Sequence, residues 1–294
     1  MSLFNSIIRR SSIDKGWSGD AKYCVEATDG RLYLLRISPA EYMNKKRHQF
    51  EMTKVVSNLG IPMCQPVEFG LCDDGVYILQ TWIYGVDADD CITHMNEDRQ
   101  YRYGVEAGEI LARIHSIPAP VVVENWETRF NAKIDRKIAM YERCELKYER
   151  GSECFLEYIA ENRHLLKNRP QTYQHGDYHI GNMMIDRDGN LVIIDFDRDD
   201  YGDPWEEFNR IVWCAQAAPA FASGMVDGYF GGQIPVEFWK LLALYIASNT
   251  LSSLPWAIPF GDKEIGVMRE QAEQVLSWYN DMKNVIPGWY CSRR

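Results

Sequence analysis

The chain has 294 residues, a length that suits two lobes better than one small domain. It carries 32 Lys and Arg against 42 Asp and Glu, so its formal net charge is −10 and a nucleic-acid partner is disfavoured. Its hydrophobic fraction of 46% and charged fraction of 25% are typical of a globular protein and exclude an intrinsically disordered one.

The N-terminal part of the sequence predicts a small antiparallel sheet with one helix. Two β-rich runs, 23–27 and 32–37, flank an Asp-Gly turn and predict a hairpin. Apolar residues at helical spacing predict a helix over 42–59. A second hairpin is expected from the runs 67–71 and 76–80, which also flank an Asp-Gly turn. The order is two strands, a helix and two more strands.

The rest of the chain predicts a mainly helical lobe. Helical spacing indicates helices over 101–114, 131–150, 152–166, 206–221, 236–252 and 262–283. In the predicted helix 131–150 the charged residues alternate in sign, which we interpret as a solvated face and not as a binding patch. One hairpin is embedded among the helices, where the apolar runs 183–185 and 191–194 flank an Asp-Gly turn. The fold class is therefore α+β, with a small sheet lobe and a larger helical lobe.

The most informative pattern is the run HGDYHIGN (175–182), followed after the embedded hairpin by IDFD (194–197). Phosphoryl transfer needs a carboxylate that orients the acceptor hydroxyl and takes its proton, and hard oxygen ligands for Mg²⁺. Asp177 can supply the first, while the hairpin is expected to bring Asn182 near Asp195 for the second. Each residue alone could simply cap a turn, but the ordered set favours a kinase-type site.

Other chemistries find little support in the sequence. The hairpin turn resembles a calcium loop superficially, but Leu191 and Asp197 stand where an EF-hand needs Gly and Glu. The cysteines form no C-x-x-C pair with the His spacing of a zinc site. Neither the G-x-S-x-G motif of hydrolases nor the H-E-x-x-H motif of zinc proteases occurs.

These residues resemble the aminoglycoside phosphotransferase family of antibiotic-modifying enzymes and, more distantly, choline kinase, both relatives of protein kinases. The resemblance spans most of the chain and rests on 175–182, 194–197, Gly202-Asp203-Pro204 and a helix with Gly108, Leu111, Ile114 and His115. It implies a two-lobed protein-kinase-like fold. It also implies that Asp177 is the catalytic base, that Asn182 and Asp195 are magnesium ligands, and that His175 supports the loop.

The resemblance implies further roles in the small lobe. A kinase needs a cation on its third strand for the α and β phosphates, tied to a carboxylate on the next helix. Arg36 takes this position, where protein kinases have Lys, and would grip phosphate through a fork instead of a point charge. Glu51 is its predicted partner, with Glu41 as the second candidate. The plain alternative is a surface Arg on an edge strand.

Backbone groups complete the predicted nucleotide site. The segment GWSGD (16–20) could lay N–H groups over the phosphates, which makes Ser18 and Gly19 candidates, although it lacks the full G-x-G-x-x-G pattern. At the hinge, the resemblance offers the carbonyl of Thr81 and the amide of Ile83 to the purine. Since these contacts come from the backbone, the side chains cannot separate ATP from GTP.

An acidic segment, 195–207, begins at Asp195, the second predicted magnesium ligand, and holds seven carboxylates against one Arg. Asp197, Asp199 and Asp200 are candidates for contacting a polycationic substrate, although solvated loop acids are common. Asp203 and Glu207 are expected to brace the loop or to begin the next helix, where acids suit the helix dipole.

The sequence therefore predicts a small-molecule kinase that transfers the γ-phosphoryl group of ATP or GTP, with Mg²⁺, to a hydroxyl of an aminoglycoside-type antibiotic. Its expected partners are the nucleoside triphosphate and a small hydroxyl-bearing acceptor, cationic if the acidic segment binds it. Two alternatives stay open: a kinase for a macrolide, choline, a sugar or an amino alcohol, and a non-catalytic nucleotide-binding regulator. The expected division is a nucleotide-binding lobe over 1–80, a hinge over 81–87 and a helical lobe over 88–294.

The sequence also bears on location. The eight scattered cysteines favour reduced thiols over a disulfide framework. The N-terminus lacks the apolar core and cleavage site of a secretory signal, and no apolar run approaches the ~18 residues of a membrane span. We therefore expect a soluble, cytoplasmic protein without a membrane partner.

Overall fold

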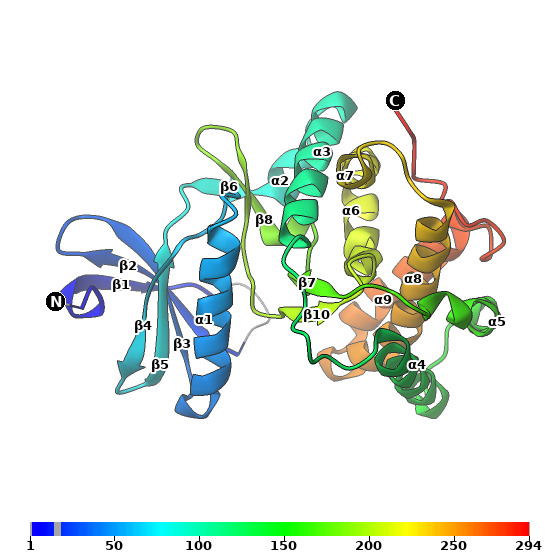
Figure 1. Cartoon of the computed structure of the whole chain (residues 1–294), viewed down its shortest axis with the longest axis horizontal. Helices are drawn as coiled ribbons and strands as arrows, with labels where there is room; N and C mark the ends of the chain where they lie inside the picture. The colour runs from blue at the N-terminus through cyan, green and yellow to red at the C-terminus, as the bar shows by residue number, and fades with distance from the viewer. Residues whose placement is uncertain (1, 15–18, 294) are drawn as a thin grey trace. The chain divides into compact units, whose positions relative to one another are not determined.

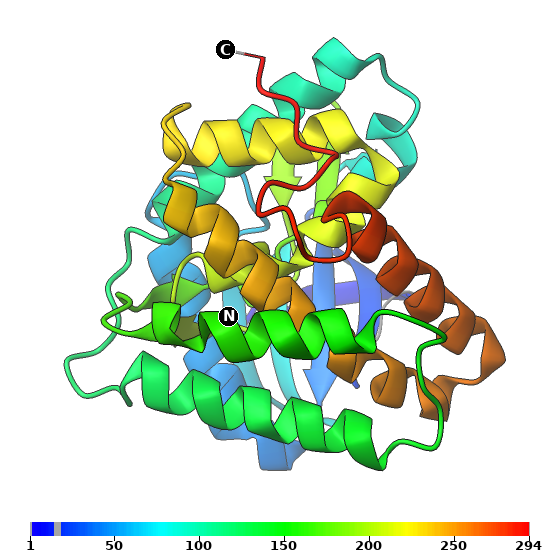
Figure 2. The ribbon, with the colours of Figure 1, turned by 90° about the vertical axis from the view of Figure 1, so that its right-hand side faces the viewer.

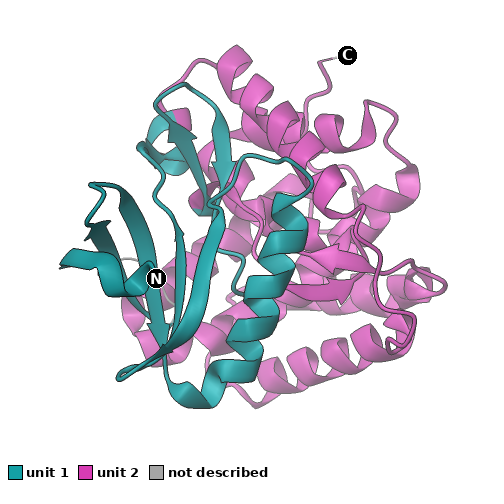
Figure 3. Ribbon diagram, turned by 60° about the vertical axis from the view of Figure 1, so that its left-hand side comes forward, with its two compact units in different colours: residues 1–91, 182–198 teal, residues 92–181, 199–294 magenta. Residues whose placement is uncertain are grey.

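The structure is a computed structural model that describes residues 2–14 and 19–293. The chain forms two compact units, coloured separately in Figure 3: Met1–Cys91 with Asn182–Arg198, and Ile92–Gly181 with Asp199–Arg294. This grouping differs from the predicted boundaries, because the segment 182–198 belongs to the same unit as the N-terminal residues. Each unit is described below by itself.

The first unit is built on an antiparallel sheet of five described strands (Figure 1). These are β1 (Ile7–Ser12), β2 (Ala21–Ala27), β3 (Leu32–Ser38), β4 (Pro66–Cys72) and β5 (Gly75–Thr81), in the order β1-β2-β3-β5-β4. Both predicted hairpins are confirmed. The sequence did not predict β1, because this strand is almost entirely exposed and lacks the alternation of apolar and polar residues that marks a half-buried strand.

The two faces of this sheet differ in chemistry. One face forms a core of Val25, Ala27, Tyr33, Leu35, Ile37, Tyr77 and Leu79. Successive side chains of a strand point to opposite faces, so the intervening residues of β2 and β3 share the other face. Lys22 and Arg36 are directly paired there across the two strands. Helix α1 (Met43–Ser57) packs its Phe50 against Phe69 of β4, with ring centroids 5.7 Å apart.

A second sheet of the first unit holds the embedded hairpin that the sequence predicted. It has the order β6-β8-β9, with β6 (Gly85–Asp87), β8 (Met183–Asp186) and β9 (Leu191–Ile193). Asp186 closes the turn, since its Oδ1 accepts hydrogen bonds from the amides of Asp188 (2.9 Å) and Asn190 (2.8 Å). The amide of Ile193 donates to the carbonyl of Pro62 (3.0 Å), which attaches the hairpin to the segment before β4.

The second unit is mainly helical, and Figure 2 shows its helices. They are α3 (Glu97–Ile114), α4 (Trp126–Arg143), α5 (Ser152–Asn162), α6 (Ile211–Ala217), α7 (Pro219–Phe230), α8 (Val236–Ala257) and α9 (Asp262–Trp278). The short helix α2 (Ala88–Ile92) precedes them along the chain. Two short strands, β7 (Thr172–Gln174) and β10 (Asp200–Gly202), pair antiparallel within this unit.

Several helix boundaries differ from the predicted ones for local reasons. The predicted helix 206–221 is a 3₁₀ turn, η5 (Glu206–Arg210), followed by α6 and α7, because Ala218 is extended and Pro219 begins a new helix. Helix α4 begins at Trp126 and not at the predicted residue 131, because the side chain of Asn125 caps it. Helix α5 begins at Ser152, and its N-cap residue is Gly151, with φ of +80°.

Helices α3 and α7 approach each other closely enough to require glycine on both. A Cβ on Gly104 or Gly108 of α3 would lie 2.1 Å from a backbone oxygen of α7. A Cβ on Gly224 or Gly228 of α7 would lie 2.2 Å from a backbone oxygen of α3. This contact fixes α3, whose Ala107 carbonyl in turn holds the predicted catalytic loop through the hydroxyl of Tyr178 (2.7 Å).

Helix α8 and the turn after it, Val236–Phe260, are long and apolar enough to cross a membrane by length and composition alone. The expectation from the sequence missed this segment because the polar residues 248–250 and 252–253 interrupt its apolar runs. Within the second unit, 67% of the most apolar 18-residue window of this segment is buried, and α8 packs against α4, α5 and α9. The segment therefore has the environment of a core helix of a soluble protein.

All eight cysteines lie in the described residues and are free thiols. Cys64, Cys144 and Cys214 are buried. Burial raises the pKa of the Cys64 thiol to about 11, so this residue is an inert part of the core.

Candidate active site

The hairpin β8–β9 brings the two predicted metal ligands to one place in the first unit. The amide of Ile194 donates to the carbonyl of Asn182 (3.1 Å), so Asn182 lies across the hairpin from the residue that precedes Asp195. Asp195 has φ of +66°, in the left-handed region. That conformation costs a residue other than Gly about 1–3 kcal/mol and persists only where surrounding contacts fix it, which is characteristic of functional sites.

The donor atoms at this position fit a magnesium ion. Asn182 and Asp195 supply amide and carboxylate oxygens, the hard ligands that Mg²⁺ takes from proteins together with water and substrate phosphates. No group of three or more His, Cys, Asp and Glu side chains in the described residues could hold a metal by itself. A magnesium site of the kind predicted needs only one or two protein carboxylates or amides, so the two residues suffice.

Arg36 of β3 is buried, with 6% of its surface exposed, and it contacts several carboxylates of the first unit. Its Nε and Nη2 lie 3.2 and 3.1 Å from Oδ2 of Asp20, and its Nη1 lies 3.0 Å from Oδ1 of Asp195. Nη2 also contacts Asp197. The alternative of a surface Arg on an edge strand is wrong, because β3 lies between β2 and β5 and the guanidinium is enclosed by acids.

A lysine, not an acid, comes from helix α1 to this cluster. The Nζ of Lys46 donates to Oδ2 of Asp20 at 2.6 Å, and the hydroxyl of Ser38 donates to Oδ1 at 2.6 Å. Burial opposes ionisation of Asp20, but Lys46, Ser38 and Arg36 together lower its pKa. Asp20 is therefore the ionised acid that links the strand cation to the helix cation.

Glu51 does not contact Arg36. It pairs instead with Lys54 (3.0 Å) on the exposed face of α1, and 60% of its side chain is exposed against 7% for Arg36. At about 100° per residue, Glu51 lies roughly 140° around the helix from the buried Lys46. The predicted Arg36–Glu51 pair is wrong, and the second candidate, Glu41, is exposed as well.

Asp197, predicted to contact the substrate, instead takes part in the cluster around Arg36. The side chain of Gln49 donates to its carbonyl (2.6 Å), and the Nζ of Lys46 lies 4.0 Å from its Oδ1. Together with the Arg36 contact, these interactions direct Asp197 toward the basic residues of the first unit.

Lys22 is a further cation of this cluster that the sequence analysis missed. It pairs directly with Arg36 across β2 and β3, and like charges in that position destabilise a sheet unless acids lie near them. Burial and Arg36 lower the pKa of Lys22, while Asp195 and Asp20 oppose that shift. The alternation of side chains along β2 would have placed Lys22 on the Arg36 face, had the register of the hairpin been known.

The predicted phosphate loop and hinge are only partly described. Ser18 lies outside the described residues, and Gly19 is exposed with open space where a Cβ would be. Thr81 ends β5, and its amide donates to the carbonyl of Gln65 (2.9 Å). Ile83 follows on the hinge and lines the cavity described next.

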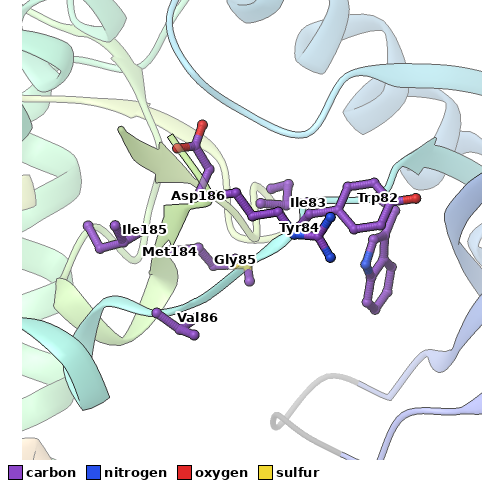
Figure 4. Close-up of a pocket in the computed structure, with 9 residues that line it drawn as sticks. Trp82, Ile83, Tyr84, Gly85, Val86, Met184, Ile185 and Asp186 are labelled. Atoms are coloured by element: carbon purple, nitrogen blue, oxygen red, sulfur yellow. The ribbon is translucent and has the colours of Figure 1, made fainter. Parts of the chain in front are cut away.

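A cavity of about 360 Å³ lies beside the predicted hinge segment, 81–87, in the first unit (Figure 4). It is lined by Trp82, Ile83, Tyr84, Gly85, Val86, Met184, Ile185, Asp186 and Arg187. Hinge residues thus form one part of its wall and β8 with the following turn forms the other. The guanidinium of Arg187 lies over the ring of Tyr84, 4.6 Å from its centroid.

In the second unit, buried groups hold the predicted catalytic loop through its backbone. His175 is fully buried, and its Nδ1 lies 3.3 Å from the amide of Asp177. The carboxylate of the buried Glu207 accepts a hydrogen bond from the amide of Gly176 (2.8 Å). His175 therefore contacts the backbone of the loop, which is the geometry of a positioning residue.

The Asp177 carboxylate is 17% exposed and lies beside two basic side chains of the second unit. Its Oδ1 is 3.2 Å from Nε of Arg210 and 3.8 Å from Nε2 of His179. A carboxylate with this exposure can reach an acceptor hydroxyl, which general-base catalysis requires. Arg210 lies in η5, far along the chain from Asp177, and no spacing rule in the sequence connects the two.

Most acids of the segment 195–207 have basic or backbone partners within their own unit. Asp200, predicted to contact the substrate, lies 3.3 Å from Arg129, and Glu206 lies 3.0 Å from Lys133. Asp199 is partly buried, and its charge raises the pKa values of Tyr173 and Tyr201 after the larger effect of burial. The segment therefore does not present its full set of carboxylates to a substrate.

The chain belongs to the phosphotransferase enzyme family, whose model matches residues 10–239. It is a phosphotransferase with the α+β, protein-kinase-like fold that the sequence predicted, so the fold prediction is confirmed. No curated protein matches the chain in sequence.

Among solved structures, the chain is similar to a thermostable mutant of aminoglycoside phosphotransferase APH(4)-Ia in complex with AMP-PNP and hygromycin B. That match has a TM-score of 0.68 and 15% identity, and it covers 95% of this chain and 96% of the other. A choline/ethanolamine kinase family protein from Mesorhizobium loti matches with a TM-score of 0.64, 16% identity and coverage of 94% and 91%. A mutant aminoglycoside 2'-phosphotransferase IIIa with GDP has a TM-score of 0.65, 15% identity and coverage of 95% and 94%. Likeness at these identities shows the fold alone.

Replacing Arg36 by Lys is expected to destabilise the first unit. One ammonium cannot reproduce the separate contacts of Nε, Nη1 and Nη2, so at least one charge-assisted hydrogen bond to Asp20 or Asp195 is lost. Losing one or two such bonds lowers the free energy of unfolding by about 2–4 kcal/mol, which urea denaturation measures. The matched control is Arg31→Lys, whose pair with Asp29 is exposed and should change stability little. Equal stability of the two variants would contradict the role given to Arg36.

Proposed function

We propose that this phosphotransferase transfers the γ-phosphoryl group of a nucleoside triphosphate to a hydroxyl of a small molecule. The observation that carries the proposal is the end of the β8–β9 hairpin, where Asn182 and the strained Asp195 lie at the positions that the family resemblance assigns to magnesium. Asp177 precedes Asn182 by five residues in the same run. When bound at Asn182 and Asp195, Mg²⁺ neutralises the charge of the phosphates.

The residues of this chain have distinct tasks in the proposed reaction. Asp177 accepts the proton of the acceptor hydroxyl and orients the oxygen for attack on the γ-phosphorus. Arg210 orients the Asp177 carboxylate, and His175 positions the loop backbone. Arg36 and Lys46 supply positive charge for the phosphates from β3 and α1. Positioning and charge stabilisation of this kind account for most of the catalysis of phosphoryl transfer.

Nucleotide binding is expected to depend on magnesium. The cations Lys22, Arg36 and Lys46 are offset by the acids Asp20, Asp195 and Asp197, so the cluster has no formal excess of positive charge for a triphosphate. We expect ATP or GTP with about 5–10 mM Mg²⁺ to raise the melting temperature and the same nucleotide with EDTA to raise it far less. An equal shift under both conditions would contradict this assignment of charges.

The acceptor is a small hydroxyl-bearing molecule in this proposal. One similar structure is a complex with hygromycin B, and another similar protein belongs to a choline/ethanolamine kinase family. An aminoglycoside remains a candidate on that basis, but the pairing of Asp197 and Asp200 with Arg36 and Arg129 removes part of the support that the acidic segment gave it. A non-catalytic regulator is disfavoured, because Asp177, Asn182 and Asp195 are all present.

The test of this function is an acceptor screen that measures nucleotide consumption. Aminoglycosides, macrolides, choline, sugars and amino alcohols are supplied in turn, with both ATP and GTP and with Mg²⁺. Acceptor-dependent release of the nucleoside diphosphate supports the proposal, and comparison of the two nucleotides gives the purine preference. The absence of turnover with every acceptor, together with normal nucleotide binding, would favour a regulator instead. A cytoplasmic location is part of the proposal, because these nucleotides and Mg²⁺ are abundant there.

A further inference from the structure

We propose that the acceptor carries an anionic group, a carboxylate or a phosphate, and that basic residues of the second unit bind it. This inference rests on the proposed kinase function and specifies the class of its acceptor. The residues are Lys133 and Lys137 of α4 and Arg210 of η5. We refer to them as the basic cluster.

The contacts of the basic cluster leave Lys137 with a neutral partner. Lys133 and Lys137 are four residues apart and share one face of α4. The Nζ of Lys133 lies 3.0 Å from Oε1 of Glu206, which satisfies its charge. The Nζ of Lys137 instead donates to the side-chain carbonyl of Asn249 on α8, at 3.2 Å. A partly buried ammonium with an amide as its partner gains interaction energy when an anion arrives.

The surroundings of Lys137 make it responsive to such an anion. Burial lowers its pKa to about 7, Lys133 and Arg210 contribute to this lowering, and Glu206 opposes them. The charged groups that face it come from α4 and η5, while α8 contributes the uncharged Asn249. An anionic acceptor would raise this pKa and so stabilise the charged form near neutral pH.

A chain of contacts places the basic cluster next to the chemistry. Arg210 lies 3.2 Å from Asp177, and the acceptor hydroxyl must come within hydrogen-bond distance of the same carboxylate. Arg210 therefore borders the acceptor. Glu206 lies in the same 3₁₀ turn as Arg210, and its Oε2 is 3.5 Å from the side chain of Gln174, which directly precedes the catalytic run. The basic cluster thus extends from the base along η5 to α4.

The balance of charge in this region favours an anion over a polycation. Lys133 pairs with Glu206 and Arg210 with Asp177, while the carboxylate of Glu207 accepts the amide of Gly176. Lys137, whose hydrogen-bond partner is the neutral Asn249, is therefore the cation of this group that an anion can pair with. A polycationic acceptor would bring like charge toward Arg210 and Lys137, which costs affinity.

The experiment compares two matched pairs of acceptors at fixed Mg-nucleotide concentration: glycerate with glycerol, and glucose 6-phosphate with glucose. Kanamycin and choline are added as cationic acceptors. We expect an anionic member to give at least a tenfold higher kcat/KM than its uncharged counterpart, and the carboxylate and phosphate arms show which anion is preferred. Lys137→Met is expected to raise KM for that anion about tenfold with little change in kcat. Lys137→Arg keeps the positive charge and is expected to have a KM close to that of the wild type. Arg136→Met, on the exposed face of the same helix, is the control.

The pH profile provides a readout that a purely structural role of Lys137 would not give. In the wild type, kcat/KM for the anionic acceptor should fall as pH rises through about 7, because Lys137 loses its proton, and this step should be absent in Lys137→Met. Circular dichroism confirms that each variant folds. Preference for kanamycin or choline, or an unchanged KM in Lys137→Met, overturns the inference but leaves the kinase function intact. Turnover with none of the alcohols overturns both.

Discussion

Replacing Asp177 by Asn is expected to lower kcat by about 10²–10⁴-fold while nucleotide binding stays nearly unchanged. The amide has nearly the same shape as the carboxylate and can still accept a hydrogen bond from Arg210, 3.2 Å away in the wild type. It cannot accept the proton of the acceptor hydroxyl, so the transition state loses its general base. Because the cations that we propose for phosphate binding are other residues, the affinity for Mg-nucleotide should not depend on this position.

The measurement is initial-rate kinetics with the acceptor found in the screen, combined with a thermal-shift titration of nucleotide. Asp188→Asn is the matched control, since Asp188 is an exposed acid in the turn of the β8–β9 hairpin and should leave kcat within twofold of the wild type. Retention of more than a tenth of the wild-type kcat by the Asp177 variant would refute its assignment as the base. Loss of nucleotide binding would instead point to a structural role for this residue.

Features encoded by local patterns were predicted from the sequence. The hairpin around residues 186–190 follows from an Asp-Gly turn between two apolar runs, and its ends carry Asn182 and Asp195. The helix over 42–59 follows from apolar spacing and is observed as Met43–Ser57. The order of strands and helices then suffices to recognise the fold, because each local preference agrees with the global structure.

Contacts between residues far apart in the sequence were not predictable in the same way. Arg36 was identified by its strand, but its partner was sought on the helix, where the family resemblance implies an acid. In this chain the acid is Asp20, before β2, and the helix supplies Lys46. Nothing in the local sequence distinguishes this buried lysine from the exposed Lys45 beside it, because the difference lies in which face of α1 the sheet covers.

The same limit applies to Lys137 of α4. Alternating charges over 131–150 predicted a solvated face, and Asp135 does have an exposed side chain, paired with Arg163. Lys137, two residues later, instead contacts Asn249 of α8. The environments of Asp135 and Lys137 differ only because α4 packs on α8. That packing depends on apolar contacts formed across the whole unit. The basic cluster could therefore be found only in the structure.

Replacing Asp203 by Asn is expected to destabilise the second unit strongly. Asp203 is fully buried and bonds both arms of one guanidinium, with Nε of Arg169 at 2.6 Å from Oδ2 and Nη2 at 2.9 Å from Oδ1. Its Oδ2 also accepts the hydroxyl of Tyr245 (2.6 Å), and its Oδ1 accepts the amide of Trp205 (3.0 Å). The variant leaves Arg169 largely buried without a counter-ion, which costs about 3–5 kcal/mol.

Urea denaturation of the variant and of a matched control measures this loss. The control is Asp200→Asn, because Asp200 also pairs with an arginine but has a side chain that is 59% exposed. Loss of this exposed ion pair should lower the free energy of unfolding by no more than about 1 kcal/mol. Similar stabilities of the two variants would mean that the structure relaxes around the Arg169 guanidinium, or that water hydrogen-bonds to it, after the Asp203 carboxylate is lost. A large difference would show that the buried pair of Asp203 and Arg169 stabilises the second unit, in which the carbonyl of Asp203 also accepts the amide of Glu206 at the start of η5 (2.9 Å).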